Sequence, residues 1–273
     1  MNNLNIKQFL EKGYFLKSQE KIIKNNCEKI NINKLVANHI GLNKIDKWRS
    51  IDGSPKVINI SIDLKKNFSK LTESKYIKEV VKKIFNNKPA VLYHSKLSLK
   101  FKEHQSWFPH QDSAYLVGNN NKILTICIFL EDITKNNGEL ILYEKSHKQN
   151  VKHKIKFHKK EKDPQIQADI NLKKYKKKHM YGKKGDIVLF DGKMIHASGN
   201  NLKNNYRPIF IFNICEVINN RIILDDYGEK CLEYNGYKYP NNILLYKIIY
   251  KIKINLFIYI KDLLYILHKL KFI

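Results

Sequence analysis

Two side chains that can bind a metal ion stand two residues apart in the middle of this chain. His110 and Asp112 belong to the stretch Phe-Pro-His-Gln-Asp-Ser-Ala-Tyr that begins at Phe108. Residues i and i+2 of an extended strand point to the same face, so a strand here would present an imidazole and a carboxylate together. These are two of the three ligands of a 2-His-1-carboxylate site, which holds non-haem Fe(II). Because His-x-Asp also occurs by chance, the prediction depends on a third ligand.

A third candidate ligand and a candidate anion-binding residue follow downstream. Residues 185–195 are predicted to form a turn, a buried strand and a second turn, and His196 begins another strand. Eleven residues later Arg207 opens an apolar run, and it is one of only three arginines among 51 Lys and Arg residues. A guanidinium binds a carboxylate through two parallel bonds, a geometry that Lys cannot copy. Arg207 is therefore expected to bind a carboxylate, with an ordinary salt bridge at a strand end as the alternative.

The order and spacing of these residues resemble the phytanoyl-CoA dioxygenase family of Fe(II)- and 2-oxoglutarate-dependent oxygenases. The resemblance covers roughly residues 9–217 and rests on the segments 9–14, 110–112, 136–140, 146–147, 185–186 and 196–200, together with Arg207. The family usually has Pro-Gly before the Ser-His pair at 146–147, whereas this chain has Glu144 and Lys145. That departure concerns a local turn and leaves the candidate metal ligands complete.

The resemblance implies a metal centre and a cosubstrate pocket. Fe(II) would be bound by His110, Asp112 and His196, and 2-oxoglutarate would bind the metal through its keto acid end. Its far carboxylate would pair with Arg207, helped by the Ser198 hydroxyl. O2 would complete the reaction, which converts 2-oxoglutarate to succinate and CO2. The further residues assigned to the cosubstrate pocket are Gln111, Thr125, Cys127 and Lys96.

The resemblance also implies a mainly β fold, a double-stranded β-helix (jelly-roll) core with a helical N-terminal buttress and a C-terminal helical tail. Apolar patterns predict strands over 90–101 and 122–130, and the first of these has a polar face that carries Lys96. In a barrel that holds a charged cosubstrate, this polar face would be the inner one. Three helices are expected in the N-terminal half. The first spans residues 5–12, the second runs from an N-cap at Ser18 to about residue 30, and the third spans residues 71–85.

The chain is expected to divide into a dioxygenase domain over residues 1–220 and a largely helical extension over 221–273. Within the domain, residues 148–184 are rich in lysine and poor in aliphatic side chains, which favours a lid that guides an anionic substrate. Basic residues mixed with aromatic ones also suit single-stranded nucleic acid. However, Asn213 stands where nucleic-acid dealkylating oxygenases carry a second arginine, so no nucleic acid is expected as a partner.

The composition bounds the cellular setting. A net charge of +26 suits nucleic acid or an anionic membrane, although a chain rich in Lys and Asn and poor in Arg is also typical of an AT-rich genome, which is the preferred explanation. The four cysteines lie far apart and form no Cys-x-x-Cys pair, so they are expected to be free thiols in a reducing compartment. The N-terminal residues lack the apolar run of a signal peptide, which indicates the cytoplasm.

Residues 243–273 form a long apolar segment interrupted by lysines. Lys247, Lys251 and Asn255 repeat every four residues, so one stripe of a helix would be polar. The segment is too charged to span a bilayer. It is expected either to pack on the domain or on a second subunit, or to lie as a peripheral helix at an anionic membrane surface. Nothing in the sequence indicates the oligomeric state.

The expected function is hydroxylation of a small-molecule or acyl-type metabolite, and an anionic substrate would suit the lysine-rich lid. Two alternatives stay open at this stage, a nucleic-acid-directed dealkylating oxygenase and a non-catalytic, membrane-associated cupin-like protein. Iron-dependent formation of succinate would separate an enzyme from the latter. No pocket residue identifies the substrate or decides between hydroxylation and desaturation.

Overall fold

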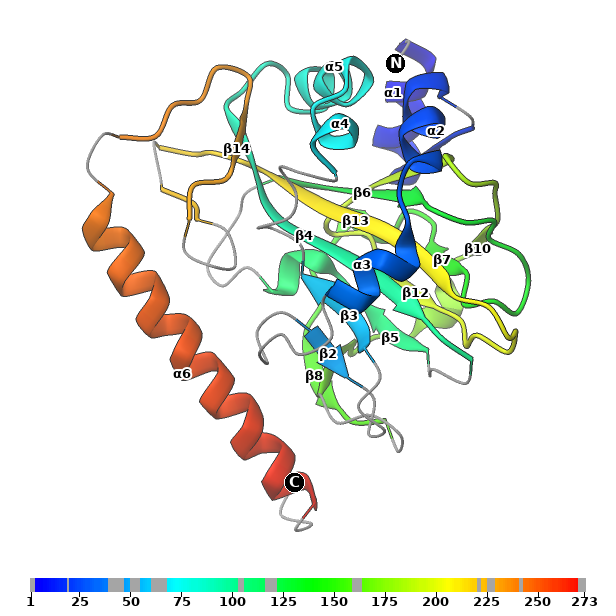
Figure 1. Ribbon diagram of the computed structural model, residues 1–273, viewed down its shortest axis with the longest axis vertical. Helices are drawn as coiled ribbons and strands as arrows, with labels where there is room; N and C mark the ends of the chain where they lie inside the picture. Colours follow the sequence, from blue (N-terminus) through cyan, green and yellow to red (C-terminus); the bar gives the residue numbers. More distant parts are fainter. Residues whose placement is uncertain are drawn as a thin grey trace.

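Two antiparallel β-sheets packed face to face make up the body of the protein, and helices cover the outer side of the larger sheet (Figure 1). This is the double-stranded β-helix, or jelly roll, that the sequence predicts. The computed structural model describes residues 3–18, 20–38, 47–49, 55–59, 68–102, 106–115, 122–158, 164–219, 222–224, 229–240 and 243–269.

The larger sheet has its strands in the order β1 (Tyr14–Lys17), β11 (Ile187–Asp191), β6 (Ile123–Phe129), β13 (Arg207–Glu216), β4 (Ala90–Lys100), β3 (Pro55–Asn59) and β2 (Lys47–Arg49), and β14 (Leu232–Tyr234) also pairs with β4. The smaller sheet has the order β10 (Lys177–Met180), β7 (Leu140–Tyr143), β12 (His196–Ser198) and β5 (Trp107–His110). A separate pair consists of β8 (His153–Lys156) and β9 (Gln165–Ala168).

The helices are α1 (Asn3–Lys12), α2 (Lys21–Glu28), α3 (Ile32–Asn38), α4 (Ser69–Thr72), α5 (Lys75–Ile84) and α6 (Leu244–Lys269), with short 3-10 turns η2 (Asp112–Tyr115), η3 (Ser146–Lys148) and η4 (Leu172–Lys174). The prediction that Ser18 caps the second helix is wrong, because the Glu20 carboxylate accepts the hydrogen bond from the Ile23 N–H at 2.9 Å. The helix predicted over 71–85 is divided at Ser74, whose hydroxyl caps α5 through the Ile77 N–H at 3.4 Å.

Side chains of the larger sheet alternate between two covered layers. On β6, Leu124, Ile126 and Ile128 are fully buried against the helices. Cys127, between them in sequence, packs instead in the apolar cluster that joins the two sheets. A strand covered on both faces reads as one continuous apolar run, as β6 does. The inner layer between the sheets also holds buried polar side chains, among them Thr125 of β6 and Arg207 and Asn213 of β13.

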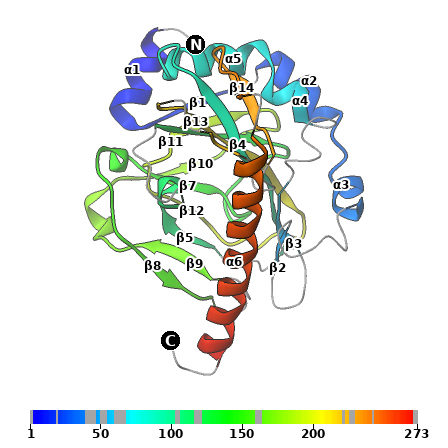
Figure 2. The ribbon, with the colours of Figure 1, turned by 90° about the vertical axis from the view of Figure 1, so that its left-hand side faces the viewer.

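Residues beyond position 220 contribute to the sheet before the C-terminal helix begins. Strand β14 pairs with β4 through Leu232, Glu233 and Tyr234, so the extension is not helical throughout. A domain boundary at residue 220 stays a prediction. Helix α6 then runs alongside the two sheets (Figures 1 and 2). Among the described residues, no helix combines the length and the apolar character that crossing a bilayer requires.

Candidate metal centre and cosubstrate pocket

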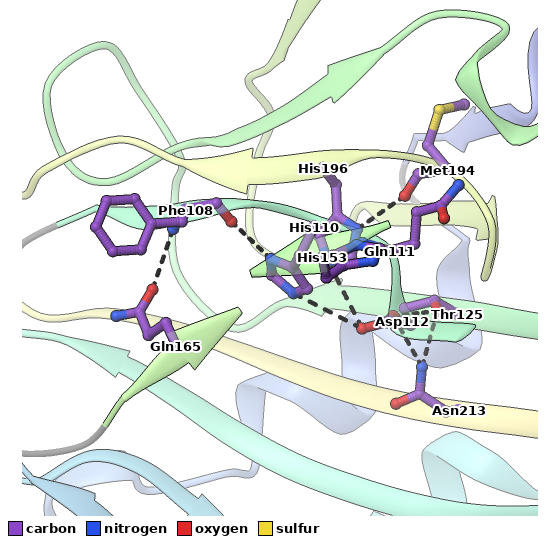
Figure 3. Close-up of polar contacts among 10 residues, drawn as sticks. All are labelled: Phe108, His110, Gln111, Asp112, Thr125, His153, Gln165, Met194, His196 and Asn213. Carbon is purple, nitrogen blue, oxygen red and sulfur yellow. Dashed lines mark hydrogen bonds and ion pairs between the residues drawn. The ribbon is translucent and has the colours of Figure 1, made fainter. Parts of the chain in front are cut away.

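Three of the predicted residues meet at one buried point between the sheets (Figure 3). Nε2 of His110 and Nε2 of His196 lie 3.9 and 3.7 Å from Oδ1 of Asp112, and the two imidazole centroids are 4.3 Å apart. Among the described residues this is the one group of three or more His, Cys, Asp and Glu side chains arranged to hold a metal ion. The premise that His110 and Asp112 share one strand is wrong, since Asp112 opens η2 just after β5 ends at His110.

Strand pairing brings the second histidine to the first. His196 opens β12, and it lies directly opposite His110 in the antiparallel pairing of β12 with β5. Each imidazole is oriented by its own backbone, because Nδ1 of His110 lies 2.7 Å from the Phe108 carbonyl and Nδ1 of His196 lies 3.1 Å from the Met194 carbonyl. A carbonyl only accepts, so both Nδ1 atoms carry the proton and both Nε2 lone pairs face the centre.

The charge states of the three side chains suit a metal. Burial lowers the pKa of His110, with a further contribution from His196, and burial also lowers the pKa of His196, so both rings are neutral at neutral pH. Burial alone would raise the pKa of Asp112, but the neighbouring His196 and Lys96 outweigh it and lower that pKa. Two neutral imidazoles and one ionised carboxylate are the donor set of a facial triad.

Only one oxygen of the Asp112 carboxylate is left for a metal ion. Its Oδ2 accepts a hydrogen bond from the Thr125 hydroxyl at 2.6 Å and another from the Asn213 amide at 3.0 Å. The same Asn213 amide nitrogen donates to Thr125 Oγ1 at 2.8 Å. These partners hold the carboxylate so that Oδ1 faces the two imidazoles (Figure 3). The sequence predicts no role for Asn213 at the metal, although its place six residues after Arg207 on one strand puts both on the same face.

The segment predicted to be a lid instead supports the metal-binding loop. Strand β10 belongs to the smaller sheet, and β8 and β9 pair beside β5. From β8, the Nε2 atom of His153 accepts a hydrogen bond from the Gln111 N–H at 3.1 Å. From β9, the Gln165 side-chain carbonyl accepts one from the Phe108 N–H at 3.1 Å. The hairpin therefore fixes the backbone on both sides of His110.

Gln111, which sequence reasoning assigned to the cosubstrate, has a different role in the structure. Its side-chain amide donates to the carbonyls of Gln149 and Lys193 at 2.8 and 2.5 Å and accepts from the Val151 N–H at 3.1 Å. The residue is 1% exposed. All of these contacts are to backbone, so Gln111 ties the metal-binding loop to the two segments around it and does not face the pocket.

Arg207 lies on the same inner face as Asn213, at the other end of one strand. Alternate residues of β13 share a face, so Arg207, Ile211 and Asn213 line the inner layer. The Arg207 side chain is 2% exposed, and its Nε has no hydrogen-bond partner within the described part of the chain. Burial lowers the pKa of Arg207 to about 10, so the guanidinium is still charged at neutral pH. A buried cation with an open donor suits an anionic ligand.

A second buried cation stands beside Arg207. Lys100 is its partner in the pairing of β13 with β4, and the ammonium group donates to the Gly199 carbonyl. Gly138 passes close to both side chains with φ +82°, and a Cβ there would lie 2.5 Å from Cδ of Lys100 and 3.4 Å from Nε of Arg207. Glycine is needed both for that backbone conformation and for the close approach.

Of the remaining predicted pocket residues, Lys96 and Cys127 lie between the triad and Arg207, whereas Thr125 and Ser198 already have hydrogen-bond partners. Lys96 and Cys127 flank Ile211 on the neighbouring strands β4 and β6, which places them between the triad and Arg207. The polar face of the strand at 90–100 is thus the inner one. The Thr125 hydroxyl is committed to Asp112, not to the pocket. Ser198 follows His196 on β12, and its Oγ accepts a hydrogen bond from the Trp107 N–H at 3.3 Å.

The turn where the chain departs from the family pattern keeps a left-handed residue. Lys145 has φ +63°, a conformation that glycine adopts freely and lysine rarely does. The turn delivers Ser146, whose hydroxyl accepts a hydrogen bond from the Ile195 N–H at 2.8 Å and lies 3.2 Å from Sδ of Met194. These contacts fix the backbone immediately before His196. Glu144–Lys145 therefore preserves the function of the turn at some cost in backbone strain.

A jelly roll that gathers two histidines and one carboxylate between its sheets, with a buried arginine along the same layer, has the design of 2-oxoglutarate-dependent non-haem iron oxygenases. Comparison of the sequence with family profiles agrees with that class. The chain belongs to the phytanoyl-CoA dioxygenase family, whose profile matches residues 15–209. The protein is accordingly an enzyme of this oxygenase class, with iron and 2-oxoglutarate as its cofactor and cosubstrate.

Solved structures share the fold at low sequence identity. EctD from S. alaskensis with bound Fe has a TM-score of 0.63 and 15% identity, covering 83% of this chain and 80% of that one. The carbocyclase SnoK from nogalamycin biosynthesis gives 0.58 and 14%, covering 79% and 84%. EvdO2 from Micromonospora carbonacea var. aurantiaca, complexed with 2-oxoglutarate, gives 0.58 and 13%, covering 80% and 91%. No curated protein matches the chain in sequence.

Proposed function

We propose that this enzyme hydroxylates a small-molecule or acyl-type metabolite, with Fe(II) held by His110, Asp112 and His196 and the far carboxylate of 2-oxoglutarate held by Arg207. The observation that carries the proposal is the placement of the triad and the buried guanidinium on one inner layer. Iron, 2-oxoglutarate and O2 together supply the oxidising chemistry, which releases succinate and CO2. The chain's own side chains bind and orient these groups.

The protein's contribution is to hold the donors in place and to keep water out. Phe108 O and Met194 O fix which nitrogen of each imidazole can bind metal. Thr125 and Asn213 occupy Oδ2 of Asp112, so the carboxylate binds through one oxygen and leaves more positions open. The Phe190 ring packs against the His196 imidazole with centroids 4.7 Å apart, which gives the centre an apolar wall.

Lys96 supports a narrower proposal about an anionic ligand. It lies on the inner layer between the triad and Arg207, and its charge contributes to the lowered pKa of Asp112. An ammonium group in that place suits a carboxylate or phosphate, supplied either by 2-oxoglutarate or by the substrate. If the cosubstrate is the partner, Lys96→Met weakens 2-oxoglutarate binding in calorimetry. If the substrate is the partner, 2-oxoglutarate binding is unchanged and the preference for acids over their amides is lost.

The test of the function is succinate release. The full-length protein, loaded with Fe(II) without oxygen and then mixed with 2-oxoglutarate and O2, should form succinate slowly, and a true substrate should accelerate this. Matched pairs of metabolites, each a carboxylic acid and its amide, test the anionic preference. Mass spectrometry of the product made under labelled O2 should show one added oxygen atom that carries the label.

The control variant is Asp132→Ala, which changes an exposed aspartate that pairs with Lys183 at 2.9 Å and is not one of the triad residues. It should form succinate like the unchanged protein, whereas Asp112→Ala should form none. Succinate formation that is equal in the Asp112→Ala variant, or absent from the unchanged protein under every loading condition, rejects the proposed function.

A further inference from the structure

The described contacts between helix α6 and the body of the protein lie near the start of the helix. Ile243, just before the helix, is buried, and Tyr250 packs against the apolar cluster that includes Val91 and Val217. The Lys247 ammonium bonds the Glu229 carboxylate, and Lys251 lies 3.9 Å from the same group. Beyond these contacts the helix continues to Lys269 alongside the sandwich (Figures 1 and 2). The prediction that the segment packs on the domain holds for its first turns, and for the rest of the helix it stays a prediction.

Most apolar side chains of the helix face solvent. Those that are between 43% and 69% exposed and share one side of the helix are Leu244, Leu245, Ile248, Ile249, Ile252, Leu256, Tyr259, Ile260, Leu263 and Ile266. We call this set the α6 stripe. Ten large side chains exposed to this extent amount to on the order of 1,000 Å² of surface, whereas the largest apolar patch on a typical monomer is about 300–600 Å². A surface of this kind requires a partner.

The shape of the α6 stripe indicates what kind of partner covers it. At about 100° per residue, its ten members span roughly 160° of the helix circumference. A two-stranded coiled coil buries a narrower seam, with two positions in seven. The stripe is bordered on one side by Lys251 and on the other by Lys253, both exposed, and the exposed Asn255 interrupts it near the Lys251 edge. A broad apolar face with lysines at both edges is typical of a helix that lies in the plane of a membrane surface.

Charge favours the same partner. The chain carries a net charge of +26, and between residues 244 and 269 it has five lysines against a single aspartate. Two copies of this helix would bring like charges together, which opposes self-association. An anionic lipid surface attracts them instead, since each lysine near such a surface contributes to binding.

We propose that the α6 stripe inserts into the headgroup and acyl boundary of an anionic bilayer, so that the oxygenase is held at a membrane surface. The apolar side chains supply the insertion, and the flanking lysines supply the attraction to acidic headgroups. The proposal does not depend on the iron site, because none of the stripe residues belongs to it.

The experiment is vesicle flotation with the full-length protein, using an equimolar mixture of phosphatidylglycerol and phosphatidylcholine and, separately, phosphatidylcholine alone. The protein should float with the mixed vesicles and much less with neutral ones, and added salt should weaken binding. Ile252→Gln with Leu256→Gln should lower the partition coefficient roughly tenfold for each side chain, or about 100-fold together. Lys251→Gln with Lys253→Gln should lower it roughly 10- to 30-fold.

Matched controls separate insertion from general surface chemistry. Ile155→Gln with Leu202→Gln changes two apolar residues that are 51% and 61% exposed elsewhere, and vesicle binding should be retained. Lys156→Gln with Lys178→Gln removes the same charge from exposed sites outside the helix and should have a smaller effect than the α6 lysine pair. Because all these residues are exposed, circular dichroism should show every variant folded.

Three results overturn the proposal. The first is flotation that is absent from the full-length protein, or equal in the stripe variant and its control. The second is a concentration-dependent dimer, seen by analytical ultracentrifugation, that the stripe substitutions dissociate while vesicles bind neither form. In that case a second copy of the chain covers the stripe. The third is loss of flotation in the lysine pair alone, with the stripe variant unaffected, which contradicts insertion.

Discussion

The two ends of the inner layer are built in opposite ways. At the triad end, the atoms that do not face the centre already have partners, since each imidazole donates to a carbonyl and Oδ2 of Asp112 accepts from Thr125 and Asn213. At the other end, Arg207 is buried with its Nε unpaired. The first end orients ligands for a metal, and the second holds a buried cation whose unpaired N–H can bind an anion.

The two ends differ in the free energy that each must supply when its ligand binds. A preorganised triad needs no rearrangement when a metal arrives, because its hydrogen bonds are made during folding. A buried guanidinium whose Nε has no acceptor destabilises the fold, and a carboxylate that accepts from it relieves that cost. Changes at the triad end should therefore act mainly on metal affinity, and changes at the Arg207 end on cosubstrate affinity.

The largest expected effect comes from the carboxylate ligand itself. Asp112→Ala should abolish binding of Fe(II), because it removes a ligand and leaves Thr125 and Asn213 without their acceptor. Metal analysis after anaerobic loading measures this, and Asp132→Ala, at a surface salt bridge, provides the control. Iron content equal to that of the unchanged protein would remove Asp112 from the site.

The Arg207 end should respond without loss of metal. Arg207→Lys should weaken binding of 2-oxoglutarate by about 10- to 150-fold, since loss of a charge-assisted hydrogen bond costs roughly 1.5–3 kcal/mol and Lys cannot form the paired bonds. Calorimetry with the iron-loaded protein measures the affinity, and Lys203→Ala, which removes a surface cation bonded to Thr134, is the control. Unchanged affinity, or a parallel loss of iron, would break the division between the two ends.

The support behind Asp112 should matter less than the ligand. Thr125→Val should lower Fe(II) affinity by about 10- to 100-fold, the usual effect of removing a partner of a metal ligand. Thr125→Ser keeps the hydroxyl and should restore affinity, which a merely structural role of the methyl group would not explain. Anaerobic titration of Fe(II) compares the three proteins, and equal affinities would show that the hydrogen bond to Asp112 has no effect on the metal.

The smallest expected effect concerns the turn before Ser146. Lys145→Gly should raise the free energy of unfolding by about 1 kcal/mol, because glycine adopts the left-handed conformation without strain. Lys148→Gly, at a position without positive φ, should lower it instead. Thermal denaturation followed by circular dichroism measures both, and iron affinity should be unchanged in each. A lower melting temperature for Lys145→Gly would contradict the strain inferred here.

Much of the metal centre could be predicted from sequence because its residues carry their chemistry in their type. His110, Asp112 and His196 are recognisable donors in a characteristic order, and the structure brings them together. The expected shared strand was wrong, however, since the chain turns into η2 at Asp112. At this turn the Gln111 N–H donates to the His153 side chain, and the Ser113 N–H donates to the Gly192 carbonyl. Both acceptors are distant in sequence, so no local pattern reports them.

Residues that act through hydrogen bonds were harder to predict than residues that act through their own chemistry. The sequence predicts Gln111 as a pocket residue, yet its side chain ties backbone segments together. At Asn213 the sequence predicts only the absence of a second arginine, not a hydrogen bond to Asp112. Strands β8 to β10 are not predicted from the lysine-rich sequence around them. Edge strands with exposed faces lack the apolar alternation that marks a strand.

Strand β13 carries Asn213 at one end of the cosubstrate pocket and Arg207 at the other, so the backbone itself sets the separation between them. If Arg207 holds the far carboxylate of 2-oxoglutarate, as proposed, this strand sets how far that carboxylate lies from the metal. A slip of one residue would turn Arg207 to the outer face, and a slip of two would move it by about 6–7 Å. One carbon more or less in the acid changes its length by roughly one bond, about 1.5 Å. A change of sheet register would therefore move Arg207 by several times the length that one carbon adds to the acid.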